Sequence, residues 1–240
     1  MKMTFDASGE VLVVTGGASG IGAAVAHGFA DAGGTSVVLD VAQPSWPTDE
    51  RTSWREVDVA DRVAVADAIA AVRTTYDQID ALVCAAAVQP RTDVVDTAPA
   101  EWQRTLDVNL NGVMWASQAV LPGMIARRRG SIVAFSSGLG LNGRAQAAAY
   151  AASKGAVTSF VKSLAAEVAA CGVRVNVIYP GVIDTPQFRA ANPGIEYEYW
   201  QRATGIGDPE DVVGPLMFLL SDAATMTGSV LTRDRAYPSS

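Results

Sequence analysis

Three residues of this sequence have types and a spacing that suit proton chemistry. Tyr150 and Lys154 stand four positions apart in the run Tyr-Ala-Ala-Ser-Lys, and Ser137 precedes Tyr150 by thirteen positions. In a helix, residues four apart share a face, so the Lys154 ammonium can lie near the Tyr150 phenol. A nearby cation lowers the phenol pKa from about 10 and lets the tyrosine exchange a proton with an alcohol oxygen. The same spacing occurs in ordinary surface pairs, so the surrounding elements must decide between the two interpretations.

The composition is that of a globular protein with a substantial core. The chain has 240 residues, of which 49% are hydrophobic and 18% are charged, and this length suits one large domain or two small ones. No apolar run approaches the roughly 20 residues that span a bilayer. Residues 1–6 lack the apolar stretch of a secretory signal. We therefore expect a cytoplasmic protein that does not bind a membrane.

Charge and ligand counts argue against several function classes. The net charge of −7 repels phosphate polymers, so we expect no nucleic-acid partner. The one basic run, at 127–129, is better explained as a helix C-terminus that the helix dipole favours. The two cysteines, Cys84 and Cys171, are far apart, and His27 is the only histidine. This inventory predicts neither a metal site nor a Ser-His-Asp triad.

Short β-branched runs alternate along the chain with longer, alanine-rich stretches of helical length. The runs that we predict to be strands are 11–14, 37–39, 54–57, 81–84, 132–135, 175–178 and 230–231. Apolar strands separated by helices predict a mostly parallel sheet of seven strands with helices on both faces. No repeat or linker divides the chain, so we expect one doubly wound α/β domain over residues 1–240.

The most irregular segment is 186–208, in which prolines and glycines surround the aromatic residues Phe188, Tyr197, Tyr199 and Trp200. Ligands of doubly wound folds bind beyond the carboxyl ends of the strands. Long loops without a role are uncommon in compact domains. We therefore expect a substrate-covering loop here. The alternative is a surface loop whose aromatic residues only pack it down.

A glycine-rich turn, Thr-Gly-Gly-Ala-Ser-Gly-Ile-Gly at 15–22, directly follows the first predicted strand and leads into a helical stretch. Its glycines permit a tight turn and the close approach of a pyrophosphate to the free N–H groups of the helix. Asp40 ends the second strand, where a carboxylate can accept hydrogen bonds from the adenosine ribose and repel a 2′-phosphate. No Lys or Arg stands at positions 17, 18, 19 or 41. These features predict a Rossmann-type site that prefers NAD to NADP.

In this order the motifs resemble those of the short-chain dehydrogenase/reductase family over nearly the whole chain. The resemblance rests on the glycine turn, on two further cofactor segments and on the catalytic residues. The matching positions are Asp58-Val59 for the adenine-contacting pair, Val108-Asn109 for the asparagine motif, Ser137 and Tyr150-x-x-x-Lys154 for the catalytic core, and Pro180-Gly181 with Ile183 and Thr185 for the segment that meets the nicotinamide carboxamide.

The resemblance implies a role for each matching residue. Tyr150 would be the general acid/base, and Ser137 would hold the substrate oxygen while Ser136 faces the core. Lys154 would lower the Tyr150 pKa and hydrogen-bond the nicotinamide ribose, and Asn109 would anchor a water that joins Lys154 to solvent. The predicted cofactor-binding residues are Gly16, Ser19, Gly20, Ile21, Gly22, Asp40, Asp58, Val59, Ala85, Ala86, Tyr150, Lys154, Pro180, Ile183 and Thr185.

Two segments depart from the family pattern. The usual Asn-Asn-Ala-Gly after the fourth strand is replaced by Cys-Ala-Ala-Ala at 84–87, where Cys84 reads as a small buried residue and backbone contacts to the cofactor survive. Near the C-terminus, Val-Asp-Gly-Gly is replaced by Arg-Asp-Arg-Ala at 233–236. This region makes subunit contacts in the family, and the resemblance implies a homotetramer or homodimer.

The motifs together predict an NAD-dependent oxidoreductase that interconverts a secondary alcohol and a ketone. Small and apolar residues near the site, Leu139, Ala147 and Val182 among them, indicate with the aromatic residues of 186–208 a largely apolar small-molecule substrate. A non-catalytic nucleotide-binding or regulatory protein on the same fold is the alternative, because a fold does not fix function. A methyltransferase of similar topology would explain the glycine turn and Asp40, but not Ser137, Tyr150 and Lys154.

Overall fold

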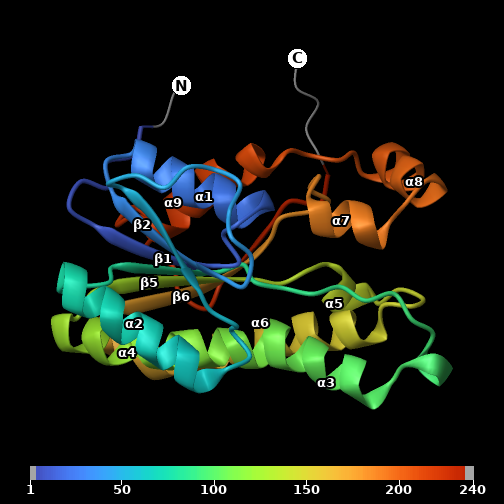
Figure 1. Cartoon of the computed structure of the whole chain (residues 1–240), viewed down its shortest axis with the longest axis horizontal. Helices are drawn as coiled ribbons and strands as arrows, with labels where there is room; N and C mark the ends of the chain where they lie inside the picture. Colours follow the sequence, from blue (N-terminus) through green and yellow to red (C-terminus); the bar gives the residue numbers. More distant parts are fainter. Residues whose placement is uncertain (1–3, 236–240) are drawn as a thin grey trace.

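The chain folds around one parallel sheet that is covered by helices on both faces (Figure 1). The computed structural model describes residues 4–235. Its strands are β1 (Val11–Thr15), β2 (Thr35–Asp40), β3 (Thr52–Glu56), β4 (Ala81–Cys84), β5 (Gly130–Phe135), β6 (Val173–Tyr179) and β7 (Val230–Thr232). They follow the order β3-β2-β1-β4-β5-β6-β7, and every neighbouring pair is parallel. The predicted doubly wound fold is confirmed.

Each predicted strand forms close to its expected position. β1, β4 and β5 are buried along their whole length, as the continuous apolar runs require for central strands of a parallel sheet. The third strand differs slightly, because it begins at Thr52 and ends at Glu56, one residue before the predicted end. The reversal of strand order between β1 and β4 creates the crevice in which such folds bind ligands.

The helices form one layer on each face of the sheet (Figure 1). They are α1 (Gly20–Asp31), α2 (Arg62–Tyr76), α3 (Pro99–Leu106), α4 (Gly112–Arg127), α5 (Leu139–Asn142), α6 (Ala148–Val168), α7 (Pro186–Ala191), α8 (Ile195–Ala203) and α9 (Val213–Leu220), with short 3-10 turns η1 (Val94–Asp96), η3 (Ala169–Cys171) and η4 (Pro209–Val212) and a π-helical turn η2 (Asp107–Asn111). Buried side chains of α2, α4 and α6 pack on one sheet face, and those of α1 and α9 on the other.

The segment 186–208, expected to be a loop, folds mainly as the helices α7 and α8. Thr185 starts α7 by accepting a hydrogen bond from Phe188 N through its hydroxyl, with Pro186 at the first helical position. Gly194, with φ +59°, turns the chain into α8. The segment is closed at its base because Gly207 N donates to Val182 O over 2.9 Å. Short capped helices therefore replace the predicted irregular loop.

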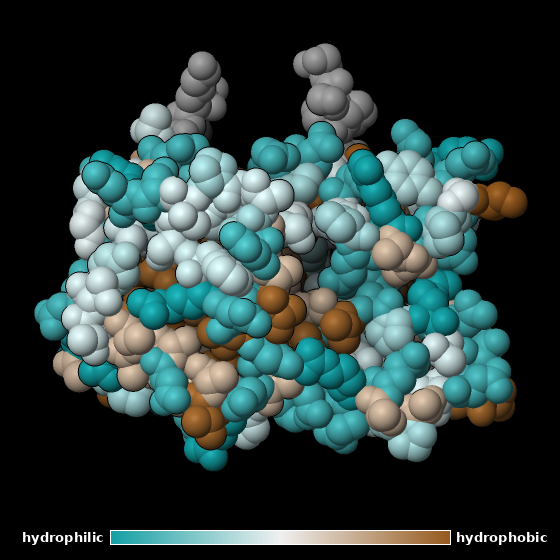
Figure 2. Space-filling view, in the orientation of Figure 1, coloured by the Kyte–Doolittle hydropathy of each residue, from teal (hydrophilic) through white to brown (hydrophobic). Residues whose placement is uncertain are grey.

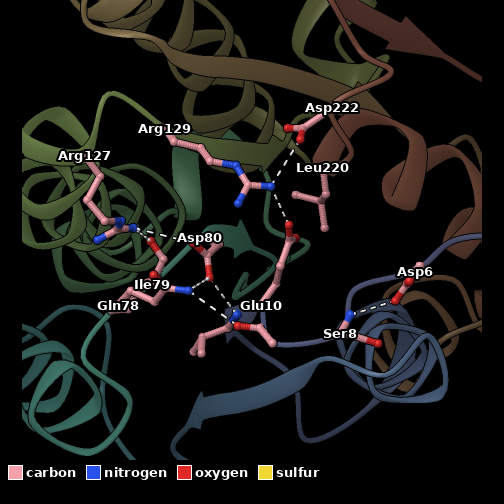
Figure 3. Close-up of polar contacts among 12 residues, drawn as sticks. Asp6, Ser8, Glu10, Gln78, Ile79, Asp80, Arg127, Arg129, Leu220 and Asp222 are labelled. Atoms are coloured by element: carbon pink, nitrogen blue, oxygen red, sulfur yellow. Dashed lines mark hydrogen bonds and ion pairs between the residues drawn. The ribbon is translucent and has the colours of Figure 1, made fainter.

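Buried and exposed ion pairs fasten the amino ends of the central strands (Figure 3). Asp80, just before β4, accepts hydrogen bonds from Val11 N at 2.9 Å and Gln78 Nε2 at 3.1 Å, and lies 3.7 Å from Arg127 Nη2. Arg129, just before β5, pairs with Glu10 and Asp222. The basic run at 127–129 thus lies at the C-terminus of α4, as predicted, and joins the strand ends there.

The segment 233–236, predicted to make subunit contacts, is described only in part. Arg233 N donates to Tyr179 O over 2.9 Å, whereas position 236 of the predicted subunit-contact segment lies outside the described residues. In the described part of the chain, no helix combines the length and the apolarity needed to cross a membrane.

We predict that Asp80→Ala lowers the free energy of unfolding by about 2–4 kcal/mol, because it leaves the Val11 N–H without its buried acceptor and removes the carboxylate that pairs with Arg127. Denaturant titration measures the change. Asp222→Ala is the matched control, since its carboxylate is 77% exposed and exposed ion pairs contribute about 0–1 kcal/mol. Equal losses in the two variants would contradict this account.

Candidate active site

One cavity of about 820 Å³ opens at the carboxyl ends of the strands. It is lined by every residue predicted to bind the cofactor, from Gly16 to Thr185, and by Ser137, Tyr150 and Lys154. Asn109 is fully buried behind the wall and does not line the cavity. On the face shown in Figure 2 the surface is mostly hydrophilic, with apolar residues gathered along its middle. The fold therefore brings together the residues that the motifs selected from distant parts of the chain.

The turn at 15–22 requires glycine at two positions, because a Cβ atom at either would collide with the main chain. Gly16 has φ +72°, and a Cβ there would stand 2.4 Å from Ala86 Cα. A Cβ on Gly22 would stand 2.2 Å from Gly16 O. The turn can therefore pass close to the segment after β4 and enter α1 directly. Ser19 makes no side-chain cap on α1, so first-turn N–H groups of the helix remain available to a phosphate at the cavity.

Asp40 closes the cavity wall at the end of β2. One carboxylate oxygen accepts a hydrogen bond from Ala18 N and the other from Ala42 N, both over 2.9 Å. These bonds fix the carboxylate between the glycine turn and the chain after β2. It thus has a defined position from which it can accept hydrogen bonds from two adjacent hydroxyl groups.

The second acidic residue of the wall, Asp58, makes an ion pair that the sequence did not reveal. Its carboxylate accepts from Arg104 Nη1 at 2.8 Å and from Ala60 N at 3.0 Å. Burial favours the neutral acid, but these hydrogen bonds prevail and lower the pKa of Asp58. A charged, oriented carboxylate therefore stands between β3 and α3.

Tyr150 and Lys154 occupy the same face of α6, as their spacing predicts. The Lys154 Nζ lies 5.7 Å from the centroid of the Tyr150 ring. Burial raises the pKa of Tyr150 to about 12, and a hydrogen bond with Ser137 opposes the rise. The expected lowering of this pKa by Lys154 is therefore absent here. In this structure the phenol carries its proton and can act as an acid.

Lys154 is buried, with 2% of its surface exposed, and its Nζ donates to Phe135 O over 2.8 Å. Burial lowers the pKa of Lys154 to about 8, and charge interaction with Cys84 opposes the shift. At pH 7, a lysine with this pKa is charged in about ten protein molecules for each molecule in which it is neutral. The cation is thus largely retained beside Tyr150, yet its proton is held weakly.

Buried hydrogen bonds tie α6 to its surroundings on two sides. Asn109, within the π-helical turn η2, exchanges hydrogen bonds with Val88 N and O at 2.8 and 2.9 Å, and donates to Ser153 Oγ at 3.0 Å. Ser153 Oγ in turn donates to Tyr150 O over 2.7 Å. π-Helical turns often occur at functional sites. The side chain of Asn109 is therefore occupied in joining α6 to the segment after β4.

Ser136 faces the core, as the sequence predicted. It is 3% exposed, and its hydroxyl donates to Lys154 O over 2.7 Å. Thr158 Oγ1 donates to Ser136 Oγ at 3.0 Å and lies 2.9 Å from the Tyr179 hydroxyl. Both serines line the cavity, and Leu139 N donates to the Ser137 hydroxyl over 3.2 Å. The Ser136 hydroxyl is thus used to position α6, whereas the Ser137 hydroxyl is not bonded to that helix's main chain.

The departure at 84–87 preserves the close packing beneath the turn. Cys84 is buried, and burial raises the pKa of its thiol to about 12, against an opposing effect of Lys154. A neutral thiol of this kind behaves as a small apolar side chain. Ala85 N donates to Thr15 O over 3.0 Å. Small residues at 85 and 86 therefore leave room for Gly16.

A group of residues that the sequence analysis missed forms the far wall of the cavity. Arg91 and Arg144 both line it and both contact Asn192 and Glu196. Trp200, from α8, donates to Asn192 Oδ1 over 3.2 Å. The only sequence signal was the presence of arginines in segments that follow β4 and α5. Leu139, Val182 and Phe188 line the cavity as the expectation of an apolar wall requires, whereas Ala147 is buried outside it. That expectation also omitted the charges of Arg91 and Arg144.

Comparison with known proteins identifies the class to which this fold and site belong. A family model described as short chain dehydrogenase matches residues 10–196, and the chain belongs to that family. Members are oxidoreductases that act on CH–OH groups with a nicotinamide cofactor, NAD or NADP. The residues present fit such a cofactor, since the glycine turn, the free helix N-terminus and Asp40 all face one cavity.

Individual relatives resemble the chain over nearly its whole length. The cis-4-hydroxycyclohexanecarboxylate dehydrogenase of Sinomonas cyclohexanicum is 34% identical over 239 residues, covering 95% of this chain and 96% of the relative. A putative NAD(P)-dependent gluconate 5-dehydrogenase from Beutenbergia cavernae, solved with bound NADP, has a TM-score of 0.87 at 31% identity, covering 97% and 98% of the two chains. An NAD⁺-bound xylitol dehydrogenase has a TM-score of 0.85 at 25% identity, covering 94% and 97%.

We predict that Gly16→Ala weakens cofactor binding at least about tenfold and lowers stability by about 1–3 kcal/mol, because the new Cβ meets Ala86 and the positive φ disfavours alanine. Calorimetric titration with NADH and NADPH measures the Kd. Gly214→Ala is the control, since no atom lies within 4 Å of its Cβ position in α9, and alanine there should leave Kd unchanged. Unaltered binding in Gly16→Ala would contradict the turn's assignment.

Proposed function

We propose that this protein is an NAD-dependent dehydrogenase that interconverts a secondary alcohol and a ketone, with Tyr150 as the general acid/base. The observation that supports the proposal best is that Ser137, Tyr150 and Lys154 meet the glycine turn and Asp40 in one cavity. When bound, the nicotinamide supplies the hydride acceptor or donor. The residues of the chain supply orientation, charge and the movement of the proton.

The proton follows the hydrogen-bonding groups of the site. In ketone reduction, the protonated Tyr150 donates to the carbonyl oxygen, which Ser137 holds beside it. In alcohol oxidation, the phenolate form of Tyr150 accepts the hydroxyl proton. Because burial lowers the pKa of Lys154 to about 8, Lys154 can release its own proton more readily than an exposed lysine. Asn109 acts by fixing α6 and the segment after β4.

The cofactor is held along the cavity from Asp40 to Thr185. The free N–H groups at the start of α1 would bind the pyrophosphate, and Asp58 with Val59 would contact the adenine. Ala85 and Ala86 would contact the cofactor through their backbone, and Pro180, Ile183 and Thr185 would meet the carboxamide. Asp40 supports NAD as the preferred form, because its carboxylate repels a 2′-phosphate. A homotetramer or homodimer remains the prediction from the family resemblance, and a cytoplasmic location remains the prediction from the N-terminal sequence.

The reaction is tested by mixing the purified protein with NAD and a panel of secondary alcohols, including cis-4-hydroxycyclohexanecarboxylate, and following NADH absorbance. Tyr150→Phe should lower kcat by about 100- to 10,000-fold, because the ring remains while the exchangeable proton is lost. Its Kd for NADH should stay within about threefold of the native value.

Tyr197→Phe is the matched control. Tyr197 lies on the segment 186–208, its phenol donates a hydrogen bond to Asp184, and it does not line the cavity. This variant should turn over normally. Normal turnover in Tyr150→Phe would remove Tyr150 from the mechanism. Nucleotide binding without turnover on any alcohol or ketone would favour the non-catalytic alternative.

We predict that Asp40→Ser raises the ratio of kcat/KM for NADP over that for NAD at least about tenfold, since the repelling carboxylate is lost while a short polar side chain remains. Steady-state kinetics with both cofactors measures the ratio, and thermal unfolding checks that the turn between Ala18 and Ala42 stays folded. A native protein that uses both cofactors equally would contradict the role of Asp40.

A further inference from the structure

Two arginines and one glutamate meet at the far wall of the catalytic cavity, and we call Arg91 and Arg144 the arginine pair. Arg144 donates to Glu196 Oε2 at 2.9 Å and to Asn192 Oδ1 at 3.0 Å. Arg91 donates to Glu196 Oε1 at 3.4 Å and to Asn192 Oδ1 at 3.5 Å. Both arginines are largely buried, with 15% and 20% of their side chains exposed.

Three segments far apart in sequence build this wall. Arg91 follows β4, Arg144 follows α5, and Glu196 begins α8, which lies beyond the end of the sheet (Figure 1). The Arg144 guanidinium stacks over the Trp200 ring, 4.8 Å from its centroid. Asn192 is 2% exposed and its Nδ2 donates to Phe188 O over 2.9 Å. The guanidinium positions are thus fixed by stacking and by a buried amide.

The charges at this wall do not balance. Two guanidinium groups face one carboxylate, and among the described residues Glu196 is the only acidic partner within ion-pair distance of either arginine. Glu101 also lines the cavity, and its carboxylate accepts from Thr92 Oγ1 at 3.1 Å rather than from either arginine. At ion-pair distance, the two guanidinium groups therefore share the single carboxylate of Glu196.

Arg91 in particular has unused donors. Its two bonds are long, and its Nε is buried without a hydrogen-bond partner. A buried guanidinium donor without an acceptor is destabilising. If the pair served only to hold α8, Arg144 would supply that contact with better geometry. Arg91 is therefore poised to bind a group that enters the cavity.

Resting on the proposed function, we infer that the alcohol or ketone substrate carries a carboxylate, and that the arginine pair binds it at the part of the cavity wall that the pair forms with Asn192 and Trp200. Guanidinium groups present parallel donors that match a planar carboxylate, which makes them selective for it. The apolar wall of Leu139, Val182 and Phe188 would contact the carbon skeleton between the two ends. The substrate is thus a hydroxy- or ketocarboxylate rather than a wholly apolar alcohol.

The test uses hydroxycarboxylates from hydroxybutanoate to hydroxyhexanoate, with the secondary hydroxyl beside the terminal methyl group, each paired with its methyl ester. The native protein should show a KM at least about tenfold lower for the best acid than for its ester. Arg91→Met and Arg144→Met keep an unbranched apolar stem and remove the charge. Each should raise KM for the acid about 10- to 100-fold and change KM for the ester by less than about threefold.

Two further variants separate binding from a structural role. Arg91→Lys keeps the charge without the planar fork, so it should recover part of the affinity for the acid. Arg202→Met removes an arginine of α8 that is 77% exposed and lies outside the cavity, and it should change neither KM. If the arginines only support the fold, the Arg91 and Arg144 variants will raise both KM values alike, and the inference is overturned.

A binding measurement distinguishes this inference from the proposed reaction. Calorimetric titration of the acid into the protein with saturating NADH should show binding that the ester lacks and that Arg91→Met abolishes. Turnover of esters and acids with equal KM would overturn the anion site and leave the dehydrogenase intact. Selective binding of the acid with no turnover of any alcohol or ketone would support the anion site and overturn the proposed reaction.

Discussion

Helix α6 is fixed by buried hydrogen bonds on two sides, and the geometry of the candidate active site depends on that attachment. Ser136 holds the Lys154 carbonyl against the end of β5, and Asn109 reaches the Tyr150 carbonyl through Ser153. These groups are buried or partly buried, so breaking any of the bonds would leave a polar atom with few alternative partners. A phenol and an ammonium on long side chains can hold a defined separation only when their helix cannot slide. Ser136, Asn109 and Ser153 thus fix the positions of the Tyr150 and Lys154 side chains.

The two ends of the sheet have different physical tasks. At the amino ends, Asp80 and Arg129 connect strands through ion pairs and main-chain hydrogen bonds. At the carboxyl ends, the segments after β4, β5 and β6 diverge to form the cavity. The same parallel arrangement that forces all strands to end together also concentrates loops, caps and charges there. The amino ends of the strands therefore contribute contacts that stabilise the fold, and the carboxyl ends form the binding cavity.

The sequence predicted those parts of the fold that depend on local patterns. Continuous apolar runs located the strands, and glycines located the turn at 15–22, because sterics there exclude any side chain. The helices α7 and α8 were missed, because Thr185 and Gly194 are single caps within a stretch rich in proline and aromatic residues. The contact of Arg91 and Arg144 with Glu196 had no local signal, since it joins three segments that lie more than 50 residues from one another in the sequence. The raised pKa of Tyr150 depends on burial, which spacing alone does not report.

The segment that carries α7 and α8 leaves and rejoins the body of the protein at neighbouring points. Val182 and Gly207 are joined by a main-chain hydrogen bond, and Ile183 and Gly207 form a parallel bridge. Because the two ends of the segment are joined, its length and amino-acid sequence can change with little effect on the stability of the sheet. The entropic cost of closing a loop grows only slowly with its length. Such a unit can be lengthened, shortened or exchanged during evolution without disturbing the catalytic helix. A lineage can thereby acquire new substrates while its proton chemistry stays unchanged.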